Sequence, residues 1–370
     1  MKIAYVISEN LSQESGVITK IKSKIKYWKL EGHEVKVISL KSNNMTSILQ
    51  DGIILSQYVK EKNLKKKILR RITISKILDD YLSQYKPDII YSRYISASPD
   101  IVPIFKKHAP YIVEINTDDR EEFKLGKKSR NIINRLTRNY FLKNASAFIS
   151  VSKELMSNQN FTKFNKDFIV IGNGYDFEKI KNYKTSFNNK IKFIFIGSPN
   201  QPWHGIDKIL YMACHFQSYE FHIVGPTIHD LKRNGKVCKN VIAHGYQNHL
   251  YLENLIKECD IGIASLALHR NNMNEASPLK SREYLAYGLP IIIGYQDTDI
   301  PDDFPYALNI GNYINNVIDN IQNITQFINS FQKISPTEII KKSQHYLDYK
   351  EKEKIRLNFI QKILQKEKTI

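Results

Sequence analysis

The sequence predicts an α/β protein of two Rossmann-like domains with a cleft between them. Short, β-branched apolar runs alternate with helical patterns along the chain, which is typical of parallel sheets covered by helices. The alternation occurs in two series, separated by the polar stretch KIKNYKTSFNNK at 179–190. A length of 370 residues exceeds one ordinary core and suits two domains. A hydrophobic content of 42% excludes a disordered chain.

The first series contains six expected strands with helical patterns between them. One such pattern runs from Gly16 to Leu30, and Gly32 suits the end of that helix before the next strand. Repetition of strand, helix and strand predicts a doubly wound sheet. The expected strands are KIAYVIS (2–8), EVKVISL (34–40), DIIYSR (88–93), YIVEIN (111–116), AFISVS (147–152) and FIVIGN (168–173).

The second series contains five further expected strands, each followed by a helical pattern. These are IKFIFIG (191–197), EFHIVG (220–225), VIAHG (241–245), IGIASL (261–266) and PIIIGY (290–295). We therefore expect a first domain over 1–175 and a second over 185–335. Polar helices at 336–370 are expected to pack back on the first domain. Loops at the carboxyl ends of the strands should line the cleft.

Composition and motifs exclude several classes of protein. The cysteines at 214, 238 and 259 are an odd number without CxxC spacing, so we expect no disulfide framework and no zinc site, in a reducing cytoplasm. No run approaches the ~18–20 apolar residues of a membrane span. The start, MKIAYVISEN, reads as a strand rather than a signal peptide. GxGxxG, GxxxxGK[ST] and GxSxG are absent, which leaves dinucleotide, P-loop and hydrolase functions without support.

The most informative stretch, 274–293, reads NEASPLKSREYLAYGLPIII. A helix that begins near Pro278 places Glu275 just before its N-terminus and Glu283 about one turn inside it. Carboxylates accept hydrogen bonds from hydroxyls and a helix N-terminus favours anions, so the pair suits a polyhydroxylated ligand that carries phosphate. Lys280 adds a cation. For the spacing alone, solvated helix charges are the ordinary alternative.

This stretch resembles the signature of the group 1 family of retaining, nucleotide-sugar-dependent glycosyltransferases, which have the GT-B fold. Further similar stretches occur in the family's order over nearly the whole chain. They are PDIIYSR (87–93), SAFISVSKEL (146–155), VIGNGYD (170–176), IGSPNQPWHGIDKIL (196–210), FHIVGP (221–226) and HGY (244–246). The resemblance implies two Rossmann-like domains, a nucleotide-sugar donor, retention of anomeric configuration and no metal or other cofactor.

The resemblance also implies roles for individual residues. Glu283 would hold the ribose hydroxyls of the donor, and Glu275 would contact the transferred sugar. His204 and Gly205 lie where the family has a Lys-Gly pair at the donor diphosphate. A second group is implied to bind the donor: Gly16 by close backbone approach, Tyr246 beside the base pocket, and Ser277 and Leu279 from the signature block.

Two permanent cations of the family's diphosphate site are missing here. Ser198 stands where the family commonly has Arg, and His204 where it has Lys. A charge-assisted hydrogen bond contributes roughly 1.5–3 kcal/mol, so a substitute is expected. Lys280 is the first candidate, and His204 would contribute when protonated. Pro278 also lacks the backbone N–H that the family's Glu-Gly-Phe-Gly stretch offers at this position.

Two acidic pairs each have two explanations. Asp118 and Asp119 follow a strand of the first domain, where they could position an acceptor hydroxyl or handle its proton, or could simply cap a helix. Asp297 and Asp299 form a D-x-D pattern, which turn chemistry explains at least as well as a metal site. We include Asp118 among the candidate catalytic residues and expect no metal.

The net charge of +18 is concentrated in the first domain, which in this family binds the acceptor. The segments 60–71 (KEKNLKKKILRR) and 124–143 (KLGKKSRNIINRLTRNYFLK) interleave basic and apolar residues. Each Lys or Arg near an anionic leaflet contributes on the order of 1 kcal/mol, so the segments suit a peripheral membrane surface and a lipid-linked acceptor. A solvated basic face is the alternative. A nucleic-acid partner is not expected, because the sequence has no recognised binding signature.

The sequence thus predicts a retaining glycosyltransferase. It would move a sugar from a nucleotide diphosphate sugar to a lipid-linked glycan acceptor, in cell-surface polysaccharide biosynthesis at the inner face of the membrane. A GT-B-fold nucleotide-sugar epimerase is the main alternative. A nucleic-acid-binding protein or a non-catalytic sensor of nucleotide sugars would be others.

Overall fold

The computed structural model describes residues 1–11, 16–43, 52–57, 63–95, 99–120, 128–180, 183, 186–188, 190–331 and 334–369. The chain divides into two units. The first contains Met1–Ile171 and Tyr349–Ile370, and the second contains Gly172–Asp348. Each unit has its own parallel sheet and its own apolar core.

A seven-stranded parallel sheet of order β3-β2-β1-β4-β5-β6-β7 forms the centre of the first unit. The strands are β1 (Lys2–Ile7), β2 (Glu34–Ser39), β3 (Ile53–Ile54), β4 (Ile89–Arg93), β5 (Tyr111–Ile115), β6 (Ala147–Ser150) and β7 (Asp167–Val170). Six of them confirm the expected strands. The two-residue β3 is too short to leave a pattern in the sequence.

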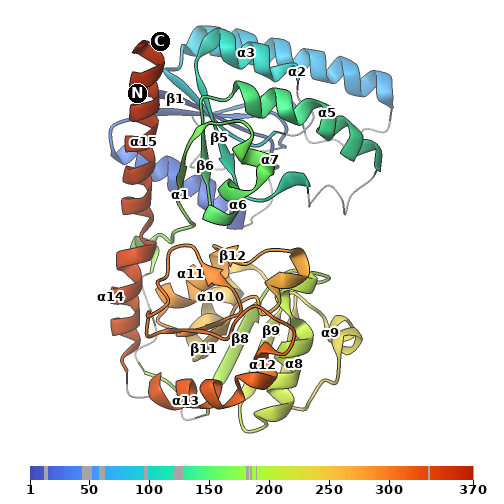
Figure 1. Cartoon of the computed structure of the whole chain (residues 1–370), viewed down its shortest axis with the longest axis vertical. Helices are drawn as coiled ribbons and strands as arrows, with labels where there is room; N and C mark the ends of the chain where they lie inside the picture. Colours follow the sequence, from blue (N-terminus) through green and yellow to red (C-terminus); the bar gives the residue numbers. More distant parts are fainter. Residues whose placement is uncertain are drawn as a thin grey trace. The chain divides into compact units, whose positions relative to one another are not determined.

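Helices cover both faces of this sheet, as Figure 1 shows. One face carries α2 (Leu64–Tyr85), α3 (Ile101–His108), α5 (Lys128–Asn144), α6 (Lys153–Ser157) and α7 (Gln159–Thr162). The other carries α1 (Gly16–Leu30) and α15 (Tyr349–Thr369). Asn63 caps α2 by accepting a hydrogen bond from the Lys66 amide, and the helix ends at Lys86, directly before Pro87.

The C-terminal helix α15 is fixed on α1 and the sheet by buried polar contacts as well as apolar packing. Trp28 Nε1 donates to Glu353 Oε2 at 2.8 Å, and Arg356 Nε donates to the same oxygen at 2.8 Å. Arg356 Nη1 also donates to the Tyr91 hydroxyl at 3.1 Å. The contacts with Trp28 and Tyr91 span 325 and 265 positions of the chain, so α15 is an integral part of the first unit.

The second unit contains a six-stranded parallel sheet of order β10-β9-β8-β11-β13-β15, and a separate pair, β12-β14. The strands are β8 (Lys192–Ile196), β9 (Glu220–Val224), β10 (Val241–Gly245), β11 (Ile261–Ile263), β12 (Glu275–Ala276), β13 (Ile291–Ile293), β14 (Gln296–Asp297) and β15 (Ala307–Asn309). All five expected strands are present. The additional ones have two or three residues each.

The helices of this unit are mostly short. They are η2 (Phe177–Lys179), η3 (Pro202–His204), α8 (Ile206–His215), α9 (Ile228–Asn234), α10 (His249–Glu258), η4 (Leu268–Asn271), α11 (Leu279–Ala286), α12 (Asn316–Asp319), α13 (Ile321–Phe331) and α14 (Pro336–Leu347). The expected C-terminal segment 336–370 is split between the units. Ile339 and Leu347 of α14 pack in the core beside Tyr284 and Leu285 of α11, and only α15 belongs to the first unit.

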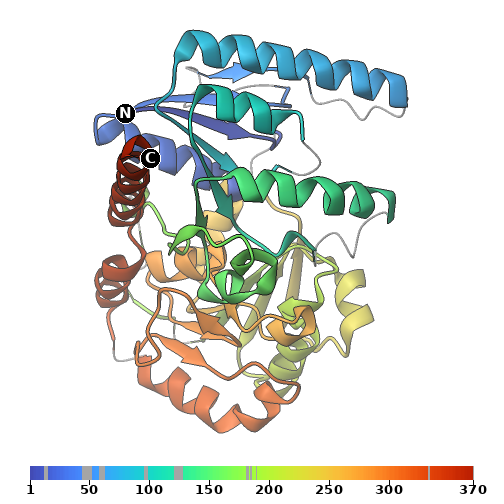
Figure 2. The same ribbon diagram turned by 45° about the horizontal axis from the view of Figure 1, so that its top comes forward.

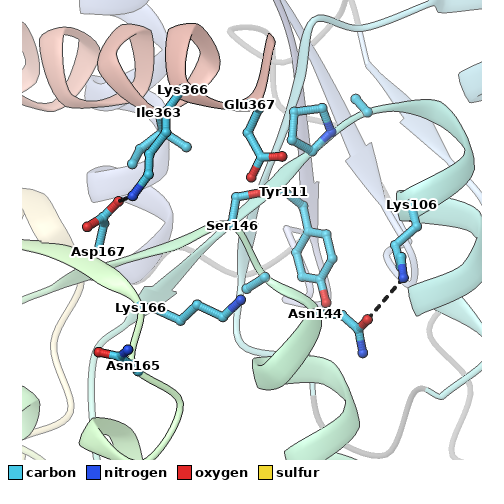
Figure 3. A pocket seen from close by; sticks show the side chains of 13 residues that line it. Lys106, Tyr111, Asn144, Ser146, Asn165, Lys166, Asp167, Ile363, Lys366 and Glu367 are labelled. Atoms are coloured by element: carbon cyan, nitrogen blue, oxygen red, sulfur yellow. Dashed lines mark hydrogen bonds and ion pairs between the residues drawn. The ribbon is translucent and has the colours of Figure 1, made fainter. Parts of the chain in front are cut away.

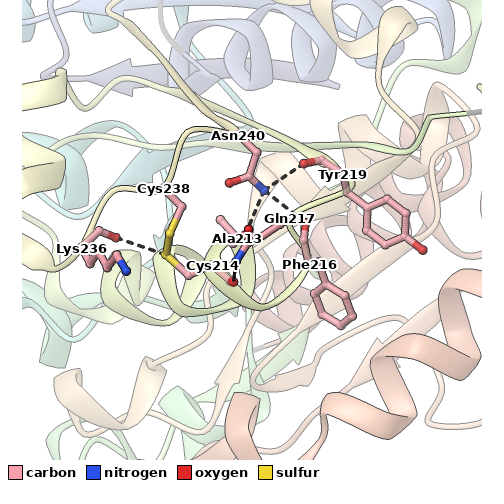
Figure 4. The surroundings of a disulfide bond; sticks show 8 residues. All are labelled: Ala213, Cys214, Phe216, Gln217, Tyr219, Lys236, Cys238 and Asn240. Atoms are coloured by element: carbon pink, nitrogen blue, oxygen red, sulfur yellow. Dashed lines mark hydrogen bonds between the residues drawn. A yellow bond between two sulfur atoms is a disulfide. The ribbon is translucent and has the colours of Figure 1, made fainter.

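The expectation that the cysteines form no disulfide is wrong. Cys214 at the end of α8 and Cys238 before β10 are joined, with Cα atoms 5.4 Å apart (Figure 4). Asn240 holds the same region by donating to the carbonyls of Ala213, Phe216 and Tyr219. The odd count of cysteines says nothing about which segments meet in space, and here the pairing of β9 with β10 brings the two together. The cysteine argument for a reducing compartment therefore loses its basis.

A cavity of about 380 Å³ lies at the edge of the first sheet where β5 and β7 begin (Figure 3). Lys106, Lys166 and Lys366 line it, together with Asn144 and Asp167. Lys366 is ion-paired with Asp167 at 2.6 Å. The cavity is at the amino ends of the strands, whereas ligands of such sheets bind beyond the carboxyl ends, so it is not the site predicted from the sequence.

Across the described part of the chain, no helix has the length and apolar character to cross a membrane.

Candidate functional site

The strand order of the second sheet reverses between β8 and β11. From β8 the chain continues to β9 and β10 on one side, and then returns to β11, β13 and β15 on the other. In an open parallel sheet, ligands bind outside the carboxyl ends of the strands at such a switch point. The loops that follow β8 and β11 are therefore the expected place for a ligand of the second unit.

His204 joins these two loops. Its Nδ1 lies 3.2 Å from the Ser265 hydroxyl, and its carbonyl accepts a hydrogen bond from the Leu266 amide at 3.2 Å. Gly205 follows with a φ of 71°, a left-handed conformation that suits glycine. Burial, and secondarily the charge of Lys280, lower the pKa of His204 to about 2. The imidazole is thus neutral at ordinary pH and cannot supply the positive charge that a protonated His204 would contribute.

Lys280 lies beside His204, in the first turn of α11. Its Nζ is 4.2 Å from the centre of the Phe195 ring, and the Phe195 and His204 rings are 5.2 Å apart. The Nζ atom is buried and has no hydrogen-bond partner among the described residues. Burial lowers the pKa of Lys280 to about 7. An ammonium without a partner is costly inside a protein, and a bound anion would provide the partner.

The N-terminus of α11 favours the same kind of ligand. Pro278 is the N-cap residue, and no side chain caps the helix. The first backbone N–H groups of a helix have no partner within the helix, and the helix dipole is positive at this end. The N–H groups from Leu279 onward and the Lys280 ammonium therefore belong to one anion-attracting end of α11, which suits a phosphate.

Glu283 lies one turn further along α11, and its carboxylate forms no hydrogen bond with a described residue. Burial, followed by the charge of Glu253, raises its pKa to about 7. The rings of Tyr175 and Tyr287 are 6.3 Å apart, and both tyrosines lie within electrostatic range of Glu283. Glu283 is partly buried, and a carboxylate without a protein donor is suited to the hydroxyl groups of a ligand.

The other candidate residues of the second unit are placed in different ways. Glu275 is partly buried in β12, and Ser277 is buried with its hydroxyl accepting a hydrogen bond from the Asn173 amide at 2.6 Å. Tyr246 follows β10 with 85% of its surface exposed. One continuous segment thus carries Glu275, Ser277, Lys280 and Glu283. His204 lies beside this segment, because its ring and the Lys280 ammonium both pack near the Phe195 ring.

Gly16 and Asp118 lie in the first unit. Gly16 is the first residue of α1. Asp118 accepts hydrogen bonds from the Arg120 amide at 3.0 Å and from the side-chain amides of Asn158 and Asn160 at 3.0 and 2.9 Å. Its neighbour Asp119 is ion-paired with Arg138 at 2.7 Å. These contacts favour the capping and packing explanation of the acidic pair, because both Asp118 oxygens already have donors.

The D-x-D pattern is bound by a residue that sequence reasoning overlooked. Arg282 forms ion pairs with Asp297 at 2.5 Å and with Asp299 at 2.8 Å. Sequence reasoning also overlooked Phe195, whose ring lies against the Lys280 ammonium. Among the residues described, no group of three or more His, Cys, Asp or Glu side chains is placed to hold a metal ion. The sequence did contain a signal for the ion pairs of Arg282: this residue directly precedes Glu283, and two aspartates follow it downstream.

Comparison with known proteins relates the chain to glycosyltransferases. Residues 16–179 match the family model of Glycosyltransferase Family 4. No curated protein sequence matches the chain. Among solved structures, sucrose-phosphate synthase from Thermosynechococcus elongatus is similar with a TM-score of 0.71, 12% identity, and coverage of 99% of this chain and 100% of that one.

Two further structures are similar over almost the whole of both chains. The lipopolysaccharide outer core galactosyltransferase WaaB, in its apo form, has a TM-score of 0.68 at 16% identity and covers 98% of this chain and 100% of its own. Anabaena HepE in complex with UDP and glucose has a TM-score of 0.66 at 13% identity, with the same coverage. The chain therefore has the GT-B fold of two Rossmann-like domains, and its N-terminal part contains a glycosyltransferase family 4 domain.

The resemblance stated from the sequence is thus confirmed for the GT-B fold, while the family model that matches residues 16–179 is that of Glycosyltransferase Family 4. The group 1 family and the retaining type depend on the 275–283 block, which lies beyond the residues that the family model matches. They stay predictions, as do the roles of the individual site residues.

Proposed function

We propose that the protein is a retaining glycosyltransferase that moves a sugar from a nucleoside diphosphate sugar to a hydroxyl of a lipid-linked glycan. One observation carries the proposal. The buried Lys280 ammonium and the partly buried Glu283 carboxylate of α11 both lack hydrogen-bond partners among the described residues, and Lys280 lies against Phe195 of the switch-point strand β8. A diphosphate for the first and sugar or ribose hydroxyls for the second satisfy both at once.

The chemistry follows from this assignment. The bond between the anomeric carbon and the diphosphate oxygen breaks, and negative charge develops on the departing nucleoside diphosphate. Lys280 and the N-terminus of α11 stabilise that charge more strongly in the transition state than in the bound donor. The acceptor oxygen forms the new bond to the anomeric carbon on the face that the diphosphate leaves, and its proton passes to the diphosphate.

Glu275 and Glu283 bind and orient the donor in this proposal. Glu283 accepts hydrogen bonds from ribose hydroxyls, and Glu275, at the end of the segment before α11, contacts the transferred sugar. Holding the reacting groups in one geometry lowers the entropic part of the barrier. His204 is neutral and contributes a hydrogen bond at the diphosphate. The UDP-bound structure of HepE, which has the same fold, supports a nucleoside diphosphate as the ligand.

A transfer assay tests the proposal. Radiolabelled UDP-, GDP- and ADP-sugars are incubated with the protein, with and without a total lipid extract as the source of acceptor, and the anomeric configuration of the product linkage is determined by NMR. Label that enters the lipid fraction with retained configuration supports the proposal. Release of free nucleoside diphosphate and an altered sugar without any acceptor would indicate the epimerase instead, and an inverted linkage would refute retention.

We further propose that the first unit attaches to an anionic membrane through α2, at the inner face of the cell membrane, in the synthesis of a cell-surface polysaccharide. Ile68, Leu69 and Ile72 are 53%, 66% and 62% exposed and lie at helical spacing on one side of α2. Leu78 and Leu82, further along the same helix, are buried in the core of the first unit. The first turns of α2 extend beyond α3 in Figure 1 and in Figure 2.

The charges around this exposed apolar stripe support an anionic bilayer as its partner. Lys65, Lys66 and Lys67 surround it and are exposed, and α2 contains no acidic residue before Asp79. An exposed apolar stripe with a basic border suits a bilayer with anionic lipids, where each cation contributes on the order of 1 kcal/mol. Of the basic segments expected from the sequence, residues 60–62 and 124–127 lie outside the described residues.

Vesicle sedimentation tests this surface. The protein should sediment with vesicles that contain phosphatidylserine and not with pure phosphatidylcholine, and binding should weaken with salt. Replacing Ile68, Leu69 and Ile72 by Ser should reduce binding at least about tenfold. Each of these side chains contributes up to about 1.5–3 kcal/mol when it is fully buried in the bilayer. Ile314→Ser in the second unit, which is 76% exposed, is the matched control. Equal binding by the triple variant and the wild type would refute the surface.

A further inference from the structure

Arg282 is the most enclosed charged residue of the donor segment. Its side chain is fully buried, and every contact of its guanidinium is within the second unit. Nη1 and Nη2 donate to the two carboxylate oxygens of Asp297 at 2.5 and 2.7 Å, and Nη2 also donates to Asp299 Oδ2 at 2.8 Å. Nε donates to the carbonyl of Asn173 at 3.0 Å. Arg282 therefore joins α11 to two separate segments, 172–174 and 296–299.

Both of those segments hold the residues that precede α11. The Asn173 amide donates to the Ser277 hydroxyl at 2.6 Å, and the Asn173 side chain donates to the Ser277 carbonyl at 2.5 Å. Asp297 pairs with Ala276 in the β12-β14 ladder. The neighbouring Thr298 amide donates to the Ala276 carbonyl at 3.2 Å. The segment that carries Glu275 is thus fixed by the same two segments that Arg282 binds.

Local structure alone would not fix this segment. The strand β12 has only two residues, and Pro278 contributes no backbone N–H. Packing around the cluster is also close: a Cβ at Gly172 would lie 2.0 Å from Asp299 Oδ2, so a larger residue there would displace the Asp299 carboxylate. The position of Glu275 relative to Lys280 and Glu283 on α11 therefore depends on contacts made through Arg282.

We propose that Arg282 is a positioning residue for the donor site, an inference that rests on the proposed function. It touches neither donor nor acceptor. Its planar guanidinium holds 172–174, 275–277 and 296–299 in one arrangement, and this arrangement places the carboxylates and the ammonium of the donor segment. Lysine keeps the charge but is a point donor on a flexible stem, so it cannot bind Asp297, Asp299 and the Asn173 carbonyl together.

The substitution Arg282→Lys tests the role. The Kd of UDP and the donor KM should each rise about tenfold, because a small displacement of binding groups has a large effect, while the acceptor KM stays within about twofold. Asp299→Asn removes the charge of one partner and leaves the Asp297 pair, so it should fold and show a smaller rise in the same direction.

Arg356→Lys is the matched control. Arg356 is a buried guanidinium in the first unit, where it binds Glu353 and Tyr91. Its replacement should lower the melting temperature and leave the donor KM unchanged. A donor KM unchanged in Arg282→Lys, or raised equally in Arg356→Lys, would overturn the inference. A wild type that binds no nucleoside diphosphate would instead refute the proposed function, and this inference with it.

Discussion

Replacing Lys280 by Arg should change how the affinity for a nucleoside diphosphate depends on pH. In the free protein, burial lowers the pKa of Lys280 to about 7. Only the charged form attracts the diphosphate, so binding is strongest below pH 7 and weakens as the pH rises above it. The bound anion raises the pKa of the ammonium, so the weakening continues up to that higher pKa. Arginine keeps its charge throughout this range.

The expected size follows from the charged fraction of Lys280. With a pKa of about 7, roughly nine-tenths of the side chains are charged at pH 6 and roughly one-tenth at pH 8, and the apparent Kd rises in inverse proportion to that fraction. The Kd of the wild type relative to Lys280→Arg should therefore increase about tenfold between pH 6 and pH 8. Glu283 and the ligand phosphate also titrate in this range, but they do so in both proteins and cancel in the ratio.

Isothermal titration of UDP into both proteins at several pH values between 6 and 8 measures this ratio. Lys280→Met is the control, and it should bind weakly at every pH. A ratio that stays constant with pH would refute the assignment of Lys280 to the diphosphate, whereas a rising ratio supports it. A thermal melt at each pH shows whether the variants are folded.

Three further predictions concern other parts of the molecule. Glu283→Ala should weaken UDP binding at least about tenfold by removing the acceptor for the ribose hydroxyls, and an unchanged Kd measured by titration would exclude that role. Cys214→Ser should lower the free energy of unfolding by about 3 kcal/mol in oxidising buffer and by little in dithiothreitol, because the bond to Cys238 closes a loop over 24 positions; denaturant melts that agree in both buffers would contradict this. Transfer activity should persist in excess EDTA because Arg282 already forms ion pairs with Asp297 and Asp299, and loss that Mn²⁺ restores would revive the metal explanation.

The sheets were predictable from the sequence because buried parallel strands are nearly continuous apolar runs. All eleven expected strands are present. The strands that the sequence did not predict, such as β3 and β12, have only two or three residues each. Helix boundaries near the C-terminus were less predictable. Polar α14 and α15 look alike in sequence, yet the apolar side of α14 packs on α11 and that of α15 on α1.

The candidate site was predictable where its residues are consecutive. The 275–283 block was recognised as a unit, and the structure keeps it as one. Long-range partners were not predictable: the contact of Lys280 with Phe195 and the binding of Asp297 and Asp299 by Arg282 depend on how separate segments meet in space. The charge state of His204 also depends on burial, which a sequence does not reveal. The disulfide between Cys214 and Cys238 was missed for the same reason.

The central claim is that the second unit binds a nucleoside diphosphate sugar through α11. Titration of UDP-, GDP- and ADP-sugars into the wild type and Glu283→Ala tests it most directly. We predict that one donor binds at one site per chain and that the variant binds it at least about tenfold more weakly. No heat of binding from any of the donors at about millimolar concentration, or equal affinity in the variant, would contradict the claim.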